Sequence, residues 1–526
     1  MTLRTHRLLF LLIFIGIQFL VTGFALAACE EGSSVKIPPG DYNGVKIGAD
    51  GRLIPSAYDK VKTFENGKSP LREVFVSPKG DDTKGDGSMK APYKTIMKGM
   101  GEIKPGTAVR IMPGEYNEQI ARNDLYGTEE HPIWIGGAPG MEWPNIVVDN
   151  VFMNISGGSY VIFHDMEVTH TPPYRAGRHG FNISSGSGQT YTTPGDPATI
   201  NLDAFYNPEE THHFVFRSLY VHHIGDSPIK TAGVNTYWLF DCEVAYGQQG
   251  LRGSGSIDNV GSHHATVAFN YVHHAIGHGM VFKGGCSDVD VYCNLLVDYG
   301  VRGVQMGQST GKEFFRPPLH LLPANERYEA KNIRTYSNIF IGGGYEINGR
   351  FEGSSAIAFA SSINCYAVNN TIINPTGQLF RILNNEQQDE SPSYPNAPRL
   401  TDNGAACCGV VANNIFYYGK LRNEAVNVGP STKPETFIVR NNLFYNTEEP
   451  NRKPDFGQVK EENSVFGSDP LFEDSSTWNF KLKANSPAIE AGADLPLVTP
   501  GGIPFAITDF VGKPYTATRS IGAMQY

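Results

Sequence analysis

The chain has 526 residues, a formal net charge of −10 and only 18% charged residues. General nucleic-acid binding requires an extended basic surface, so this composition argues against a nucleic-acid partner. The 58 glycines suit tight turns between short strands, and no helical heptads or long basic runs are present.

Residues 1–28 have the composition of an export signal. Arg4 and Arg7 precede an apolar run over 8–20, and small residues follow. The segment ends in LAAC, which resembles the bacterial lipobox and implies that Cys29 is lipidated and becomes the mature N-terminus. The alternative is ordinary signal-peptidase cleavage, with Cys29 incidental. We therefore expect an exported protein, anchored by lipid at the outer membrane or cell surface, or released to the periplasm or the medium.

An oxidising location outside the cytoplasm would allow the other cysteines to pair as disulfides. The alternative, for Cys242 and Cys293, is that they are small buried hydrophobic residues. The cysteines that follow the signal region are Cys242, Cys286, Cys293, Cys365, Cys407 and Cys408.

Residues 29–72 are rich in Gly, Pro and Lys without clear periodicity, and are predicted to form a linker or an N-terminal wrap. The rest of the chain, 73–526, is predicted to be one long domain, because a repeat protein grows by adding turns.

A repeated unit marks the middle of the chain. Each copy has an Asp or Asn, an apolar pair, a polar corner and a Gly-flanked strand. Within a copy, apolar residues alternate with period two and β-branched residues recur, which favours strands over helices. Repeats of 20 to 50 residues are typical of solenoids. The copies are 214–233, 238–255, 267–285 and 292–308, and Asn294, Asn338, Asn370, Asn414 and Asn442 continue the pattern.

The two ends of this domain resemble secreted right-handed parallel β-helix proteins of the pectate-lyase type. The opening contains VFVSPKGDDTKGDGSMKAPYKTI and PGTAVRIMPGEYNE, and the end contains DPLFEDSSTWNFKLKANSPAIEAGAD and IGAMQY. The resemblance implies an all-β, single-stranded right-handed parallel β-helix (solenoid) with an N-terminal capping helix over 92–103 and long loops. Such solenoids are commonly monomers.

Three segments interrupt the repeat: 174–207, 307–332 and 384–408. Long irregular insertions between short strands often carry binding surfaces, so these are candidate walls of a groove along the coil.

One strand column supplies candidate catalytic residues. We take Ile229, Leu251, Met280, Val304, Ile357 and Phe380 as inward positions, so their neighbours point outward. Successive coils lie about 4.8 Å apart, which would place Lys230 beside Arg252. A row of basic side chains of this kind would either bind an anion or simply be exposed to solvent on the face of the sheet. The outward residues are Lys230, Arg252, Gln305 and Arg381, with Lys283 two positions further along its strand.

A corner column lies beside this row and contains His and Tyr residues, which are proton-transfer groups. β-Elimination from a uronate requires a cation for the carboxylate, a base near C5 and an acid at the leaving oxygen. The column therefore adds His274 as a catalytic candidate and His223 and Tyr246 as substrate-binding candidates. Its residues are His222, His223, Tyr246, His273, His274, Asp298 and Tyr299.

The segment SPIKTAGVNTYWLFDCEVAYGQQGLRGSG resembles the chondroitinase B and alginate lyase family. That resemblance implies Lys230 as base and Arg252 as acid or carboxylate partner. The family's Arg is followed by His-Gly, whereas Gly253-Ser254 follows here. Resemblance to the β-helix pectate lyases implies instead that Lys283 is a base beside calcium.

Calcium is a candidate cofactor because it takes several carboxylate and carbonyl oxygens. Asp226, Asp241 and Asp298 are candidate ligands, and structural corner carboxylates are the alternative. Arg302, Gln305, Arg316 and Arg381 are candidate substrate-binding residues, although Pro317-Pro318 could make the Arg316 segment a rigid loop only.

The predicted function is an exported polysaccharide lyase that cleaves a uronate-containing glycan, with an acidic polysaccharide as partner. A β-helix glycoside hydrolase would need two carboxylates about 5 to 9.5 Å apart, and the column offers Lys and Arg instead. A uronate epimerase shares the first step of the lyase reaction. A non-catalytic carbohydrate-binding solenoid is the alternative outside the enzymes.

Overall fold

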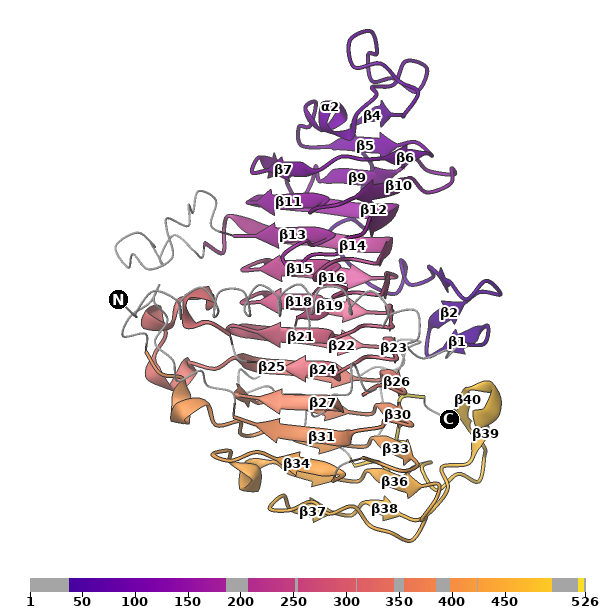
Figure 1. Cartoon of the computed structure of the whole chain (residues 1–526), viewed down its shortest axis with the longest axis vertical. Coiled ribbons are helices and arrows are strands. Elements are labelled where there is room, and N and C mark those ends of the chain that lie inside the picture. The colour runs from indigo at the N-terminus through magenta and orange to yellow at the C-terminus, as the bar shows by residue number, and fades with distance from the viewer. Residues whose placement is uncertain are drawn as a thin grey trace, which may run out of the picture.

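The structure is a computed structural model that describes residues 37–185, 207–250, 254–308, 310–344, 354–384, 398–422, 424–493 and 519–524. The chain winds into a parallel β-helix, with its coils stacked along the vertical axis of Figure 1. Almost all of its regular structure is β, so the predicted fold class is confirmed. No helix among these residues is both long and apolar enough to cross a membrane.

One side of the coil is a ten-stranded parallel sheet. Its strands are β7 (Ile120–Arg122), β11 (Met153–Ser156), β13 (Phe181–Ser184), β15 (Ile229–Ala232), β18 (Gly255–Val260), β21 (His278–Lys283), β24 (Arg302–Met306), β27 (Ser355–Ala360), β31 (Gln378–Leu383) and β34 (Val426–Val428).

The other sides form a 25-stranded sheet in which most coils contribute two successive strands. Its strands are β4 (Arg72–Val76), β5 (Thr107–Ile111), β6 (Glu115–Tyr116), β8 (Leu125–Tyr126), β9 (Ile133–Gly137), β10 (Asn145–Val148), β12 (Gly158–His170), β14 (Thr211–His222), β16 (Asn235–Phe240), β17 (Glu243–Ala245), β19 (His263–Ala268), β20 (Tyr271–His273), β22 (Cys286–Tyr292), β23 (Leu295–Val297), β25 (Ala330–Tyr336), β26 (Ile339–Ile341), β28 (Ser362–Ile363), β29 (Tyr366–Val368), β30 (Thr371–Ile373), β32 (Val410–Ala412), β33 (Ile415–Tyr418), β35 (Ile438–Arg440), β36 (Leu443–Asn446), β37 (Glu461–Glu462) and β38 (Val465–Phe466).

The remaining elements are short. They are two small antiparallel sheets, β1 (Gly40–Tyr42), β2 (Val45–Ile47) with β3 (Leu53–Ile54), and β39 (Phe472–Asp474) with β40 (Asn479–Leu482); the helix α2 (Ile96–Met100); and the 3-10 helices η2 (Lys312–Phe314), η3 (Leu319–Leu321), η4 (Ala324–Glu326), η5 (Thr401–Gly404), η6 (Pro434–Thr436) and η7 (Ser475–Thr477).

The segment 92–103 contains only α2, and a capping helix of the predicted length is not evident. Thr95 caps α2 by accepting a hydrogen bond from the Lys98 N–H, and Gly101 follows its last turn. Ile96 and Met100 are buried in the core, and this short helix packs against β4 and β5, the first strands of the coil.

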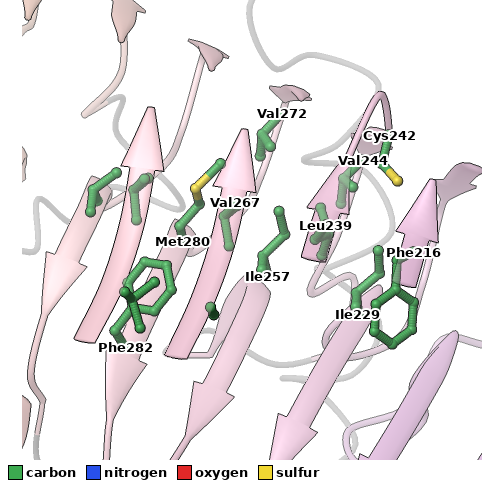
Figure 2. Packing of buried hydrophobic residues seen from close by; sticks show 14 of the residues in the cluster. Phe216, Ile229, Leu239, Cys242, Val244, Ile257, Val267, Val272, Met280 and Phe282 are labelled. Carbon is green, nitrogen blue, oxygen red and sulfur yellow. The ribbon is translucent and has the colours of Figure 1, made fainter. Parts of the chain in front are cut away.

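Apolar side chains stack inside the coil in register. Phe216 pairs with Leu239, and Leu239 with Val267, so each layer covers the one before it. Figure 2 shows these side chains beside Ile257 and Met280 in the same core. All are fully buried, and burying one such side chain contributes roughly 1.5–3 kcal/mol.

The corners of the coil use left-handed backbone positions spaced five residues apart. In one coil they are His264, Phe269 and His274, with φ values of 52°, 55° and 52°. Left-handed φ is uncommon for non-glycine residues but enriched for Asn, Asp and His, which explains the polar corners of the repeat.

An asparagine ladder joins successive coils at the middle of these corners. The Asn338 amide donates to Asn370 Oδ1 at 3.0 Å and to the Val291 carbonyl at 2.9 Å, and its oxygen accepts from the Asn294 amide. The side chains are fully buried, so each ladder bond replaces a bond to water that is lost. The ladder is Asn270, Asn294, Asn338, Asn370, Asn414 and Asn442.

The N-terminal segment packs along the outside of the 25-stranded sheet. Asp241 accepts hydrogen bonds from the Ser56 and Ala57 N–H groups at 3.0 and 2.6 Å. Glu65 pairs with Arg217 at 2.7 Å. Asp241 therefore fastens this segment to the coil.

Replacing Asn338 by Ala should lower the free energy of unfolding by roughly 2–4 kcal/mol, because buried donors and acceptors on both neighbouring coils lose their partner. Urea and thermal unfolding midpoints would show it. The exposed Asn451→Ala is the matched control. An Asn338→Ala midpoint equal to that of the control would contradict the structural role of the ladder.

Candidate functional site

The register of the ten-stranded sheet corrects one predicted position. Ile229 pairs with Ile257 and Lys230 with Asp258, so the column does not contain Leu251 and Arg252. The other predicted inward residues, Met280, Val304, Ile357 and Phe380, are confirmed and fully buried. Arg252 itself lies outside the described residues.

Asp258 joins two lysines on neighbouring strands. Its carboxylate lies 3.8 Å from Lys230 Nζ and 3.2 Å from Lys283 Nζ. The Asp258 side chain is only 1% exposed, whereas those of Lys230 and Lys283 are 28% and 15% exposed. We call Lys230, Asp258 and Lys283 the lysine–aspartate cluster.

The two lysines have different surroundings. Burial lowers the pKa of Lys283, but the ion pair with Asp258, and the charges of Glu329 and Asp226, outweigh burial, so its net pKa is raised. Lys283 is therefore protonated at neutral pH and is a fixed cation rather than a base. Lys230 is the member of the cluster that solvent reaches best.

Two polar groups interact electrostatically with Lys230: Asp226, from the corner before β15, and His179, from the corner before β13. Asp226 accepts from Ser254 Oγ and the Gly177 N–H, both at 2.7 Å. Burial raises the pKa of Asp226, but His179, these hydrogen bonds and Lys230 together hold it below its usual range. Burial, followed by the charge of Lys230, lowers the pKa of His179 to about 4, so its ring is neutral.

The two predicted residues of β24 differ in burial, because Gln305 is buried whereas Arg302 is half-buried. Gln305 is fully buried and accepts a hydrogen bond from Arg302. His278, at the start of β21, has its pKa held well below the usual range by burial, then by Arg302 and Lys283. Gln305 is therefore a structural neighbour of the cluster, not an exposed substrate contact.

The loop after β24 is fastened to the edge of the cluster. Arg316 is 5% exposed, and its N–H donates to the Gly284 carbonyl at 3.0 Å. Glu329 accepts from the Gly284 N–H at 2.8 Å and from the N–H and hydroxyl of Thr310 at 2.6 and 2.7 Å. Arg316 is therefore largely covered within this loop, and its role in substrate binding stays a prediction.

The predicted corner column is present. The rings of His223 and Tyr246 stack at 4.5 Å, those of Tyr246 and His274 at 4.9 Å, and His274 Nε2 lies 3.8 Å from Asp298. His273 lies 3.4 Å from Glu243 and 2.7 Å from His274 through its ring nitrogens. Because the rings cover one another, they rigidify the corner that precedes the ten-stranded sheet.

Arg381 extends the outer column further along the sheet. In the sheet register, Arg381 pairs with Ala358, which in turn pairs with Gln305. The Arg381 Nε donates to Asn427 Oδ1 at 2.9 Å. Burial lowers the pKa of its guanidinium. Strands β21, β24 and β27 lie between Arg381 and the strand of Asp258, so the structure does not bring it into the cluster.

The candidate calcium ligands do not converge. Asp241 holds the N-terminal segment, Asp298 lies beside His274, and Asp226 borders Lys230. Over the described ranges, no group of three or more His, Cys, Asp or Glu side chains could hold a metal ion. The residues therefore do not fit a calcium site.

Buried cysteines are Cys242, Cys286, Cys293, Cys365 and Cys407, whereas Cys408 is exposed, and none of the six forms a disulfide bond within the described residues. The interpretation of Cys242 and Cys293 as small buried hydrophobic residues is confirmed.

Sequence reasoning missed Asp258, His179 and Glu329. Asp258 follows Ile257 in the alternating pattern SGSIDNV, so aligning Ile257 instead of Leu251 with Ile229 would have found it. His179 and Glu329 come from corners of irregular length and carry no repeat signal.

Comparisons with known proteins show similarity of fold. Residues 78–136 match a family model described as a protein of unknown function (DUF1565). No curated protein matches the chain. Similar solved structures include a GH136 lacto-N-biosidase from Eubacterium ramulus (13% identity, TM-score 0.48, covering 75% of this chain and 68% of that one), the pectate lyase Pel9A (14%, 0.45, 87% and 97%) and XylC with xylose (12%, 0.49, 86% and 98%).

Replacing Asp258 by Leu should destabilise the fold by roughly 3–5 kcal/mol, because two neighbouring ammonium groups lose their buried counter-charge. The double variant Asp258→Leu/Lys283→Met should recover much of that loss, since it removes the more buried cation as well. Thermal and urea unfolding of the two single variants and the double variant measure this coupling. Additive effects of the two substitutions would contradict the ion pair.

Glu329 should make stability depend on pH. Burial raises its pKa to about 7 in the folded protein, above the usual value, so the folded state binds the proton more tightly. The stabilisation is complete below about pH 4.3 and is lost as pH rises through 7. Relative to Glu329→Gln, the wild type should gain roughly 2.5 kcal/mol between pH 8 and pH 5. If the stability–pH curves of the wild type and Glu329→Gln run parallel, the raised pKa of Glu329 is contradicted.

Proposed function

We propose that this chain is a carbohydrate-active enzyme that cleaves a uronate-containing glycan by β-elimination, with Lys230 as the base. The observation that carries the proposal is the lysine–aspartate cluster on the outside of the ten-stranded sheet. It combines a partly exposed amine, Lys230, with a second lysine that Asp258 keeps protonated.

The chemistry assigns one role to each lysine. The Lys230 amine takes the C5 proton, the C4–O bond breaks, a C4–C5 double bond forms and the leaving oxygen takes a proton from water. Negative charge develops on the uronate carboxylate as the proton leaves, and a fixed positive charge nearby stabilises it. Lys283 supplies that charge, while Asp258 holds both amines in place.

A uronate epimerase would use the same proton abstraction and return the proton to the other face of the sugar. Product analysis separates the two, because only elimination leaves an unsaturated sugar. The proposed substrate is an acidic polysaccharide that the exported protein encounters outside the cytoplasm. A lipid at Cys29 is the proposed anchor to the membrane.

A glycoside hydrolase is the second candidate. The column was expected to lack carboxylates, but Asp258 lies in it and Asp226 lies next to Lys230. Hydrolases also need one carboxyl group that is protonated at neutral pH. Asp226 has a lowered pKa, and Glu329, with a raised pKa, is buried behind Thr310 and Gly284. Elimination is therefore ranked first.

The test is the ultraviolet absorbance of unsaturated uronate after incubation with alginate, pectate, chondroitin, dermatan and ulvan. Lys230→Arg should lose activity roughly 10³-fold, because Arg keeps the charge but does not act as a base. Lys283→Arg keeps a cation and should retain much more activity. Lys90→Arg, at an exposed position, is the control.

Equal losses in Lys230→Arg and Lys283→Arg would contradict the separate roles. No absorbance on any substrate, together with release of reducing ends, would replace elimination by hydrolysis. No product of either kind would favour the non-catalytic binding protein.

A further inference from the structure

A cavity of about 340 Å³ lies at the corner where the ten-stranded sheet leads into the 25-stranded sheet. Its floor includes His264, Asp288 and Asn332, which hold the same left-handed corner position in three successive coils. Its roof comes from the loop after β24 and includes Pro317 and Tyr328. The cavity begins at Gly285, two residues after Lys283, but lies beyond the Gly284–Arg316 contact.

The roof of this cavity is preformed. Arg327 Nε donates to the Leu319 and Leu322 carbonyls at 3.0 and 3.1 Å, and the Arg327 N–H donates to Thr401 Oγ1 at 3.2 Å. Phe315 and Leu319 are buried against Leu400 beneath it. A cavity with fixed walls and this volume is at the small end of the range for ligand sites.

The floor offers polar groups with spare bonding capacity. Asp288 accepts one hydrogen bond, from Asn332 Nδ2 at 2.9 Å, and makes no ion pair within the described part of the chain. Asp290, two residues later, is instead paired with Arg334 at 2.6 Å. The sheet therefore neutralises Asp290 and leaves Asp288 available to a ligand.

His264 adds a second available group. It is exposed, and its side chain forms no hydrogen bond with any other residue that the structure describes. Because His263 pairs with Ser287, His264 lies beside Asp288 on the neighbouring coil. A carboxylate and an imidazole one coil apart can bind adjacent hydroxyl groups, since the first accepts hydrogen bonds and the second both donates and accepts.

We propose that this cavity binds a neutral, hydroxyl-rich sugar residue through Asp288 and His264. The Asp288 carboxylate repels a uronate or phosphate, and the cation of the lining, Lys331, is already paired with Glu326 at 3.3 Å. The size admits about one sugar ring. The choice of a sugar rests on the proposed carbohydrate function, but the site needs no reaction at Lys230. It would hold a neutral unit or branch of the glycan beside the cluster.

Ligand-observed saturation-transfer NMR on the full mature chain tests this directly. The probes are methyl glycosides of galactose, glucose, xylose and rhamnose, with those of galacturonate and glucuronate for comparison. At least one neutral glycoside should bind. Asp288→Ala and His264→Ala should each weaken it tenfold or more, whereas Asp455→Ala, at an exposed carboxylate, and Lys230→Arg should leave it unchanged.

Thermal unfolding verifies that each variant folds, and Asp288→Asn, which keeps the size of the side chain, should weaken binding in the same direction. No binding of any neutral glycoside, a preference for the uronates, or binding unaffected by Asp288→Ala and His264→Ala would each overturn the proposal. Elimination activity is measured in a separate assay, so a lack of sugar binding at this cavity can be distinguished from a lack of lyase activity.

Discussion

The register between successive coils is the constraint on which the rest of this structure depends. In the two long sheets each strand pairs in parallel with a strand one coil away, so a shift of one residue would exchange the inner and outer faces of that strand. The buried asparagine ladder fixes the register, because each amide bonds both to the next ladder residue and to a backbone carbonyl. Lys230 meets Asp258, and His264 lies beside Asp288, as consequences of that register.

Most of the fold could be predicted from the sequence because its signals are repeated. Alternating apolar residues, recurring asparagines and polar corners identified the solenoid and most of the inward column. The error at Leu251 has a physical cause: the corner between β17 and β18 spans 246–254, whereas the next one, between β20 and β21, spans 274–277. The length of a corner can vary because the chain there is not paired with a neighbouring strand. A prediction that assumed a constant repeat length therefore placed the strand that follows β15 in the ten-stranded sheet too early, at Leu251 instead of Ile257.

The candidate site was less predictable because it depends on burial and on partners from different coils. Lys230 and Lys283 were identified as outward residues, but their distinct roles come from Asp258, which lies between them. Arg316 and Gln305 looked like surface residues in the sequence, yet they are buried because neighbouring loops and side chains cover them. Buried ion pairs are costly unless each charge is matched, and here Asp258 supplies the counter-charge that raises the pKa of Lys283.

A crystal structure of a Lys230→Met variant with a bound uronate oligosaccharide would test the role of Lys230. We expect the glycan to lie on the outside of the ten-stranded sheet, with its carboxylate directed toward Lys283. C5 of one uronate should face residue 230, about 3–4 Å from the place that the Lys230 amine occupies in the wild-type protein. An oligosaccharide bound on another face, or with C5 turned away from residue 230, would contradict the assignment of Lys230 as the base.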